Sequence, residues 1–191
     1  MHKHIIFVLL CMCIFSAEGA ISEQEQANTY SVSAERGDPA SQHNLGVMYM
    51  AGSGVDKSYP QAFKWFTKAA EQGLASSQVN LGTMYMEGLG VDKDNSKAFI
   101  WYEKAALQGN AIGQNNLAQM YMLGLGIPHN PREAIKWWLK AAQQGNVNSQ
   151  VSLGTIYDLG LGVPKNPTEA IKWWQKAAQQ GNVSAKERLK N

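Results

Sequence analysis

His43 and His129 are the histidines that follow residue 20, and they are the first side chains to consider for general-base catalysis or metal binding. A histidine pair that binds a metal ion needs close spacing, such as four residues apart on one helix. The pattern instead places His43 in a predicted helix and His129 in a loop much further along the chain. We therefore interpret both as surface histidines and predict no metal site.

The serine and glycine motifs do not indicate a catalytic centre. No serine is followed by a lysine three residues later, which is the spacing that opens the serine β-lactamase signature. The segment Ala51-Gly52-Ser53-Gly54-Val55 lacks the first glycine of a nucleophile elbow, and Gly88-x-Gly90 lacks the third glycine of a dinucleotide-binding loop. Asp92 and Asp94 supply too few oxygen ligands for calcium. We predict no catalytic residue, metal or cofactor; the alternative function is a cell-wall-directed enzyme such as a β-lactamase-like hydrolase.

Adjacent tryptophans occur at Trp137-Trp138 and again at Trp173-Trp174. Such pairs could form a platform for sugar binding. Alanines accompany them, however, at spacings of three and four residues, which indicates one buried face of a helix. We therefore predict that these tryptophans belong to the core.

The elements that carry these residues repeat every 36 positions. Glycine recurs at 37, 73, 109, 145 and 181, leucine at 45, 81, 117, 153 and 189, tyrosine at 49, 85, 121 and 157, and tryptophan at 65, 101, 137 and 173. Periods of 20 to 50 residues are typical of solenoids, in which stacked units bury a continuous core.

The residue pattern of each unit predicts two helices. In residues 110–145, Leu117 and Tyr121 mark one apolar helical face, and Gly124 follows as a helix-ending residue that reaches positive φ at little cost. Asn130 and Pro131 then have the residue types of an N-cap and a first turn, so a second helix begins there. The sequence predicts an all-α fold, a right-handed α-α superhelix built as a helical-hairpin solenoid. The predicted divisions are a signal peptide at 1–19, an N-terminal half-repeat cap at 20–37, repeats at 38–73, 74–109, 110–145 and 146–181, and a C-terminal half-repeat cap at 182–191.

The first twenty residues resemble a secretory signal peptide. Lys3 precedes an apolar stretch from Ile5 to Phe15, and small residues follow as far as Ala20. This stretch is too short to span a bilayer, since a transmembrane helix needs about 20 residues. Cleavage after Gly19 would remove both cysteines, and a cut after Ala20 is the alternative. We predict a secreted or periplasmic protein with no stable membrane insertion.

The repeated residues also carry a family resemblance. Leu81-Gly82, Met84-Tyr85, Gly88, Gly90-Val91, Trp101-Tyr102, Lys104-Ala105-Ala106 and Gln108-Gly109 resemble the Sel-1-like repeat, a longer relative of the tetratricopeptide repeat. The resemblance covers nearly the whole predicted mature chain and implies an adaptor that assembles protein complexes. A cysteine-rich bacterial branch of the family is linked to β-lactam binding and hydrolysis, and this chain departs from it because its two cysteines lie in the predicted signal peptide.

We locate the predicted binding surface on the first helix of each unit, because these helices line the concave face of such solenoids. If Leu45 and Tyr49 face the core, then positions 43, 44, 47 and 50 and their equivalents point away from it. The stripe is uncharged until its last member, and its asparagines and methionines suit an extended peptide; an ordinary polar helix face is the alternative. The predicted partner-binding residues are Asn44, Val47, Met50, Asn80, Thr83, Met86, Asn116, Gln119, Met122, Ser152, Thr155 and Asp158.

The charge of the chain favours a protein or peptide as the partner. The formal net charge is +2, and no basic run stands out, so nucleic-acid binding has no electrostatic support. The sequon Asn182-Val183-Ser184 also permits a eukaryotic luminal adaptor.

Overall fold

The computed structural model describes residues 21–190, so the predicted signal peptide, with Cys11 and Cys13, lies outside the described residues. The described part of the chain consists of helices joined by short loops, with no strand. The helices are α2 (Glu23–Glu35), α3 (Pro39–Ala51), α4 (Tyr59–Glu71), α5 (Ala75–Glu87), α6 (Asn95–Leu107), α7 (Ala111–Leu123), α8 (Pro131–Gln143), α9 (Val147–Leu159), α10 (Pro167–Gln179) and α11 (Val183–Arg188).

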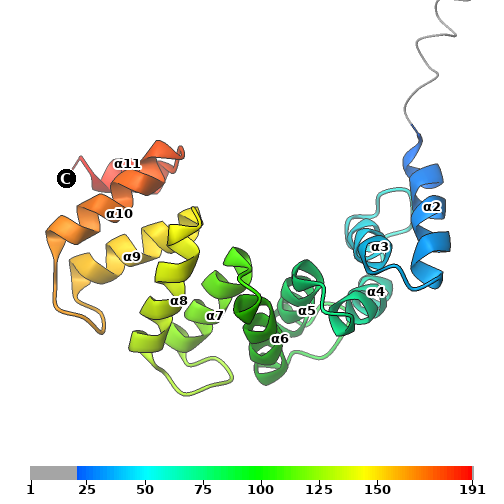
Figure 1. Ribbon diagram of the computed structural model, residues 1–191, viewed down its shortest axis with the longest axis horizontal. Coiled ribbons are helices and arrows are strands. Elements are labelled where there is room, and N and C mark those ends of the chain that lie inside the picture. Colours follow the sequence, from blue (N-terminus) through cyan, green and yellow to red (C-terminus); the bar gives the residue numbers. More distant parts are fainter. Residues whose placement is uncertain (1–20, 191) are drawn as a thin grey trace, which may run out of the picture.

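Each helix packs against the one before it and the one after it in the chain. Figure 1 shows the hairpins following one another along an arc, with α2 at one end and α11 at the other. We call α3, α5, α7 and α9 the first helices and α4, α6, α8 and α10 the second helices of four hairpins. The predicted all-helical solenoid is confirmed.

The helix ends follow the predicted signals. The side-chain oxygen of Asn130 accepts a hydrogen bond from the backbone N–H of Glu133 at 3.2 Å, so it caps α8. Asn166 caps α10 in the same way. Gly124 ends α7 in the left-handed conformation, with φ of +67°. Short polar side chains and glycine therefore satisfy the free backbone groups at these ends.

The second glycine of each inter-helix loop allows a close backbone contact. Gly126 has φ of +71°, and a Cβ placed there would lie 2.5 Å from the carbonyl oxygen of Asn95 at the start of α6. Gly54 and Gly90 make the equivalent backbone contacts at the starts of α2 and α4, and Gly162 lies against the side chain of Pro131 at the start of α8. Each loop therefore rests on the second helix of the preceding unit, or on α2, at a distance that excludes a side chain.

Within each hairpin, a small residue of the first helix faces a large aromatic residue of the second. A Cβ on Gly46 or Gly82 would lie 2.8 or 2.7 Å from the ring of Phe66 or Tyr102, respectively. In the third hairpin, Ala118 and Trp138 share one core cluster. The prediction that the paired tryptophans belong to the core is confirmed for Trp138, Trp173 and Trp174, which are 4 to 6% exposed. Trp137 is partly exposed, and the Lys140 ammonium lies 4.0 Å from its ring centroid.

A pair of glutamines ties each hairpin to the helix before it. Gln78 is buried at the start of α5, and its Nε2 donates to the carbonyl oxygen of Ala70 in α4 at 3.2 Å. Its Oε1 accepts from Nε2 of Gln108, at the end of α6, at 2.7 Å. The same pairing recurs at Gln42 with Gln72, at Gln114 with Gln144 and at Gln150 with Gln180. These hydrogen bonds link three consecutive helices at every junction.

Candidate partner-binding surface

All twelve residues of the predicted binding stripe lie on first helices, and none is fully buried. Val47 and Gln119 are exposed, and the other ten are partly exposed. The first helices carry little charge. The only acids among them are Glu87 and Asp158, and none contains lysine or arginine. The candidate surface is therefore a polar face with a small apolar component.

Positions 79 and 115, which are equivalent to position 43, were predicted to point away from the core, and that part of the prediction is wrong. Val79 is 7% exposed and Asn115 is 4% exposed. These positions lie against the next unit rather than solvent. Asn115 Oδ1 accepts hydrogen bonds from Ser149 Oγ at 3.0 Å and from Trp138 Nε1 at 3.2 Å. Its amide is therefore used in the junction between the third and fourth hairpins.

Two residues of the stripe are held by a buried tyrosine. The Tyr102 hydroxyl lies 2.9 Å from Thr83 Oγ1, and Asn116 also hydrogen-bonds to it. Burial raises the pKa of Tyr102, so its hydroxyl stays protonated at neutral pH. Asn116 Oδ1 additionally accepts from Nδ2 of Asn115 at 3.1 Å. The side chains of Thr83 and Asn116 are therefore oriented by the core before any partner binds.

Other amides of the stripe remain free. Asn44, Asn80 and Gln119 make no side-chain hydrogen bond to any other part of residues 21–190. Each amide offers both donors and an acceptor, the combination that pairs with an extended peptide backbone. The three residues come from three successive first helices, so together they form a row of unused hydrogen-bonding groups.

A row of methionines accompanies the free amides. Met50, Met86 and Met122 are partly exposed and pack at the edges of three core clusters. Their flexible thioether side chains can adapt to different apolar groups. The fourth residue of this row is Asp158, in the last turn of α9.

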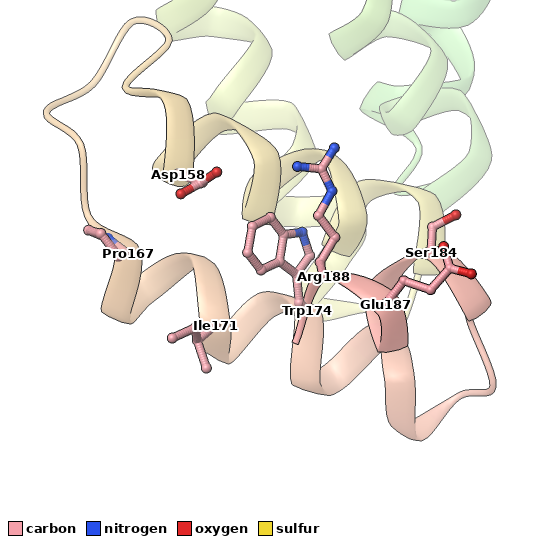
Figure 2. A pocket seen from close by; sticks show the side chains of 7 residues that line it. All are labelled: Asp158, Pro167, Ile171, Trp174, Ser184, Glu187 and Arg188. Atoms are coloured by element: carbon pink, nitrogen blue, oxygen red, sulfur yellow. The ribbon is translucent and has the colours of Figure 1, made fainter. Parts of the chain in front are cut away.

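Asp158 also marks the end of the stripe, where a pocket of about 660 Å³ opens between α9, α10 and α11. Figure 2 shows the Trp174 ring near its centre, with Asp158 on one side and Arg188 on the other. The guanidinium carbon of Arg188 lies 5.5 Å from that ring centroid. Arg188 occupies the repeat position of Asn44 and Asn80, so the stripe changes from neutral to charged in this last unit.

The interpretation of His43 as a surface residue is wrong, whereas His129 is exposed. His43 is half-buried; its Nδ1 lies 2.8 Å from Ser77 Oγ, and its ring packs against Phe66 with centroids 5.5 Å apart. Burial lowers the pKa of His43, which favours the neutral ring. This contact has the residue types of a serine–histidine pair, but Ser77 is fully buried and no substrate can reach it.

Residues 21–190 have neither a cluster of metal ligands nor a membrane-spanning helix. They contain no group of three or more histidine, cysteine, aspartate or glutamate side chains arranged to hold a metal ion. In the same part of the chain, no helix has the length and apolar character needed to cross a membrane.

Comparison with known protein families identifies the repeat. The Sel1 repeat model matches residues 39–74, 75–110, 111–146 and 147–182. These stretches cover most of the chain and begin one residue after the units predicted from the glycine spacing. No curated protein matches the chain significantly.

Solved structures have the same architecture. The chain is 36% identical to c5321, a protective antigen of uropathogenic Escherichia coli that displays an SLR fold, with a TM-score of 0.81 over 88% of this chain and 36% of that one. It is 35% identical to a Sel1 repeat protein from Oxalobacter formigenes, with a TM-score of 0.81 over 86% of this chain and 67% of that one. Cysteine rich protein B of Helicobacter pylori is 25% identical, with a TM-score of 0.56 over 70% of this chain and 96% of that one. The chain thus spans about a third of the length of the E. coli structure.

Proposed function

Because this chain belongs to the Sel1 repeat family, a scaffold family that generally mediates protein–protein interaction, we propose that it binds an extended segment of a partner protein along the first helices, on the concave face of the array. The observation that carries this proposal is the row of free amides at Asn44, Asn80 and Gln119. The adjacent methionines Met50 and Met86 offer apolar contacts beside those amides.

The preferred partner segment follows from the chemistry of this face. The first helices lack basic residues, and Asp158 is the only charged residue in the stripe. A highly charged segment would lose hydration there without gaining a partner of opposite sign. We therefore expect an uncharged segment that supplies backbone amide groups and apolar side chains.

The test begins with capture of a partner on the purified chain and measurement of its affinity. The variant Asn44→Ala, Asn80→Ala, Gln119→Ala removes the free amides without touching the buried network. A matched control, Gln143→Ala, Gln175→Ala, Gln179→Ala, removes three exposed amides from the second helices. We expect the first variant to weaken binding at least tenfold, since a net hydrogen bond contributes about 0.5–1.5 kcal/mol. Equal effects of the two variants, or no effect of the first, would reject this surface.

We also propose that the protein is secreted or periplasmic, on the basis of the signal-peptide pattern before Ala20. Expression of the full chain in a bacterial host, followed by mass measurement of the exported product, tests this directly. The expected product begins at Ala20. Retention of the intact chain in the cytoplasm would contradict the proposal.

The alternative of a β-lactamase-like hydrolase gains no support from the described residues. Their one serine–histidine contact, between Ser77 and His43, is closed to solvent on the serine side. Incubation of the purified chain with nitrocefin tests the alternative. Catalytic turnover that survives Ser77→Ala would show a different active site and would revive the enzyme hypothesis.

A further inference from the structure

Lysines recur on the second helices with the period of the repeat. Lys104, Lys140 and Lys176 are exposed, lie 36 residues apart and form no ion pair within residues 21–190. Each ammonium lies over the ring of the tryptophan one helical turn earlier, at 4.0, 4.0 and 4.3 Å from the ring centroid. The cation–π contact favours one position of each side chain on the helix surface.

Among the helices of the hairpins, only the second helices carry basic residues. The second helices contain nine basic and four acidic residues, a net charge of +5. The first helices contain no basic and two acidic residues, a net charge of −2 with neutral histidine. The two helix series therefore differ by seven charges, although the whole chain has a net charge of only +2. This separation was not apparent from the composition.

We propose that the exposed side of the second helices binds an anionic lipid bilayer surface through these lysines, leaving the partner-binding stripe on the first helices free. Eight of the nine basic residues are lysine and only Arg132 is arginine. Lysine is a hydrated point charge that suits diffuse attraction to a charged surface, whereas protein interfaces favour arginine and are depleted in lysine. Charge complementarity with phosphate headgroups therefore identifies the occupant.

Exposed apolar side chains on α6 support a lipid surface over a soluble polyanion. Ile100 is 47% exposed and Leu107 is 71% exposed. Ile100 occupies the repeat position of Lys64, Lys136 and Lys172, on the same helix surface as the lysine row. Apolar groups beside basic ones are the combination that peripheral membrane proteins insert at the headgroup level.

The experiment is vesicle co-sedimentation of the mature chain with equal parts phosphatidylglycerol and phosphatidylcholine, compared with phosphatidylcholine alone. We expect binding to the anionic vesicles only, and loss of that binding as added salt shortens the Debye length. Lys104→Gln, Lys140→Gln, Lys176→Gln should weaken binding about 100-fold, at about fivefold for each lysine.

A matched control removes the same charge from the inter-helix loops. Lys57, Lys93 and Lys165 also recur at the repeat spacing, but they lie in exposed inter-helix loops. Replacing all three with glutamine should change binding much less. Lys104→Arg, Lys140→Arg, Lys176→Arg keeps the charge and should retain vesicle binding, and circular dichroism shows whether each variant is folded.

Three outcomes would overturn the proposal: no binding to anionic vesicles, equal losses in the two glutamine variants, or binding to heparin with none to vesicles. Because no partner protein is present in these assays, their failure leaves the peptide-binding proposal untouched.

Discussion

The glutamine pair at each repeat junction gives a quantitative prediction for stability. In Gln78→Leu the side-chain volume is nearly kept, and two hydrogen bonds are lost, one to Ala70 and one from Gln108. The Ala70 carbonyl still accepts from the backbone N–H of Gly73 at 3.0 Å, and Gln108 is exposed, so neither partner is left unsatisfied. We therefore expect a loss of about 1–2 kcal/mol in the free energy of unfolding, the sum of two net hydrogen bonds without a further desolvation penalty.

A double-mutant cycle tests whether that loss arises from the pair. Urea unfolding followed by far-UV circular dichroism should be measured for Gln78→Leu, for Gln108→Ala and for the double variant. Because the two residues are in direct contact, the double variant should lose less than the sum of the single ones, by about 0.5–1 kcal/mol. The junction at Gln114 and Gln144 has the same geometry and should repeat the result. Strict additivity, or a loss below about 0.5 kcal/mol for Gln78→Leu, would refute this account of the junction.

Two other substitutions test the packing between helices. Gly154→Ala should destabilise the fourth hairpin by about 1–3 kcal/mol in thermal or urea unfolding, because the new Cβ would lie too close to the Trp174 indole nitrogen. The contrasting variant Ala118→Gly should not raise stability, because the packing of Trp138 already accommodates the alanine side chain. Acidification below about pH 6.5, which is the pKa of an unfolded histidine, should lower the free energy of unfolding. Burial lowers the pKa of His43 in the folded protein, so the unfolded chain binds the proton more tightly. His43→Asn should remove that part of the pH dependence, and an unchanged pH profile in this variant would show that His43 does not cause it.

Much of the fold could be predicted from the sequence because each unit repeats the same local signals. Gly124 and Asn130 act through the backbone of their own helix ends, so their role depends only on nearby residues. The tryptophan pairs follow the helical period and indicate the buried face in the same way. Four copies of each signal then fix the hairpin order without knowledge of the packing.

Some contacts between units could not be predicted in this way, because residues such as His43 and Ser77, 34 positions apart, touch only after the hairpins stack. His43 was therefore interpreted as a surface residue, and Asn115 was expected to point away from the core. One signal for these contacts was present in the sequence. The junction pairs are His43 with Ser77 and Asn115 with Ser149. In the other two units, Val79 and Val151 occupy the repeat position of His43 and Asn115. A polar junction pair therefore occurs in every second unit.

The sequence predicted the position of the binding stripe without distinguishing its members. Thr83 and Asn116 belong to the same sequence pattern of polar first-helix residues as Asn44 and Asn80. Only the packing of Tyr102 shows that Thr83 and Asn116 are already hydrogen-bonded. The charge difference between the two helix series was also missed, because the overall charge averages it out.

The loop glycines have a consequence for how such an array can change in length. Gly126 rests on the backbone at the start of α6, and its equivalents rest on the first residue of α2, α4 or α8 at the other hairpins. The angle between neighbouring hairpins is therefore set by a contact between adjacent units and does not depend on how many units there are. A gene that gains or loses 36 codons would lengthen or shorten the arc at constant curvature, so the size of the ligand that fits along it can evolve in whole steps while its shape is preserved.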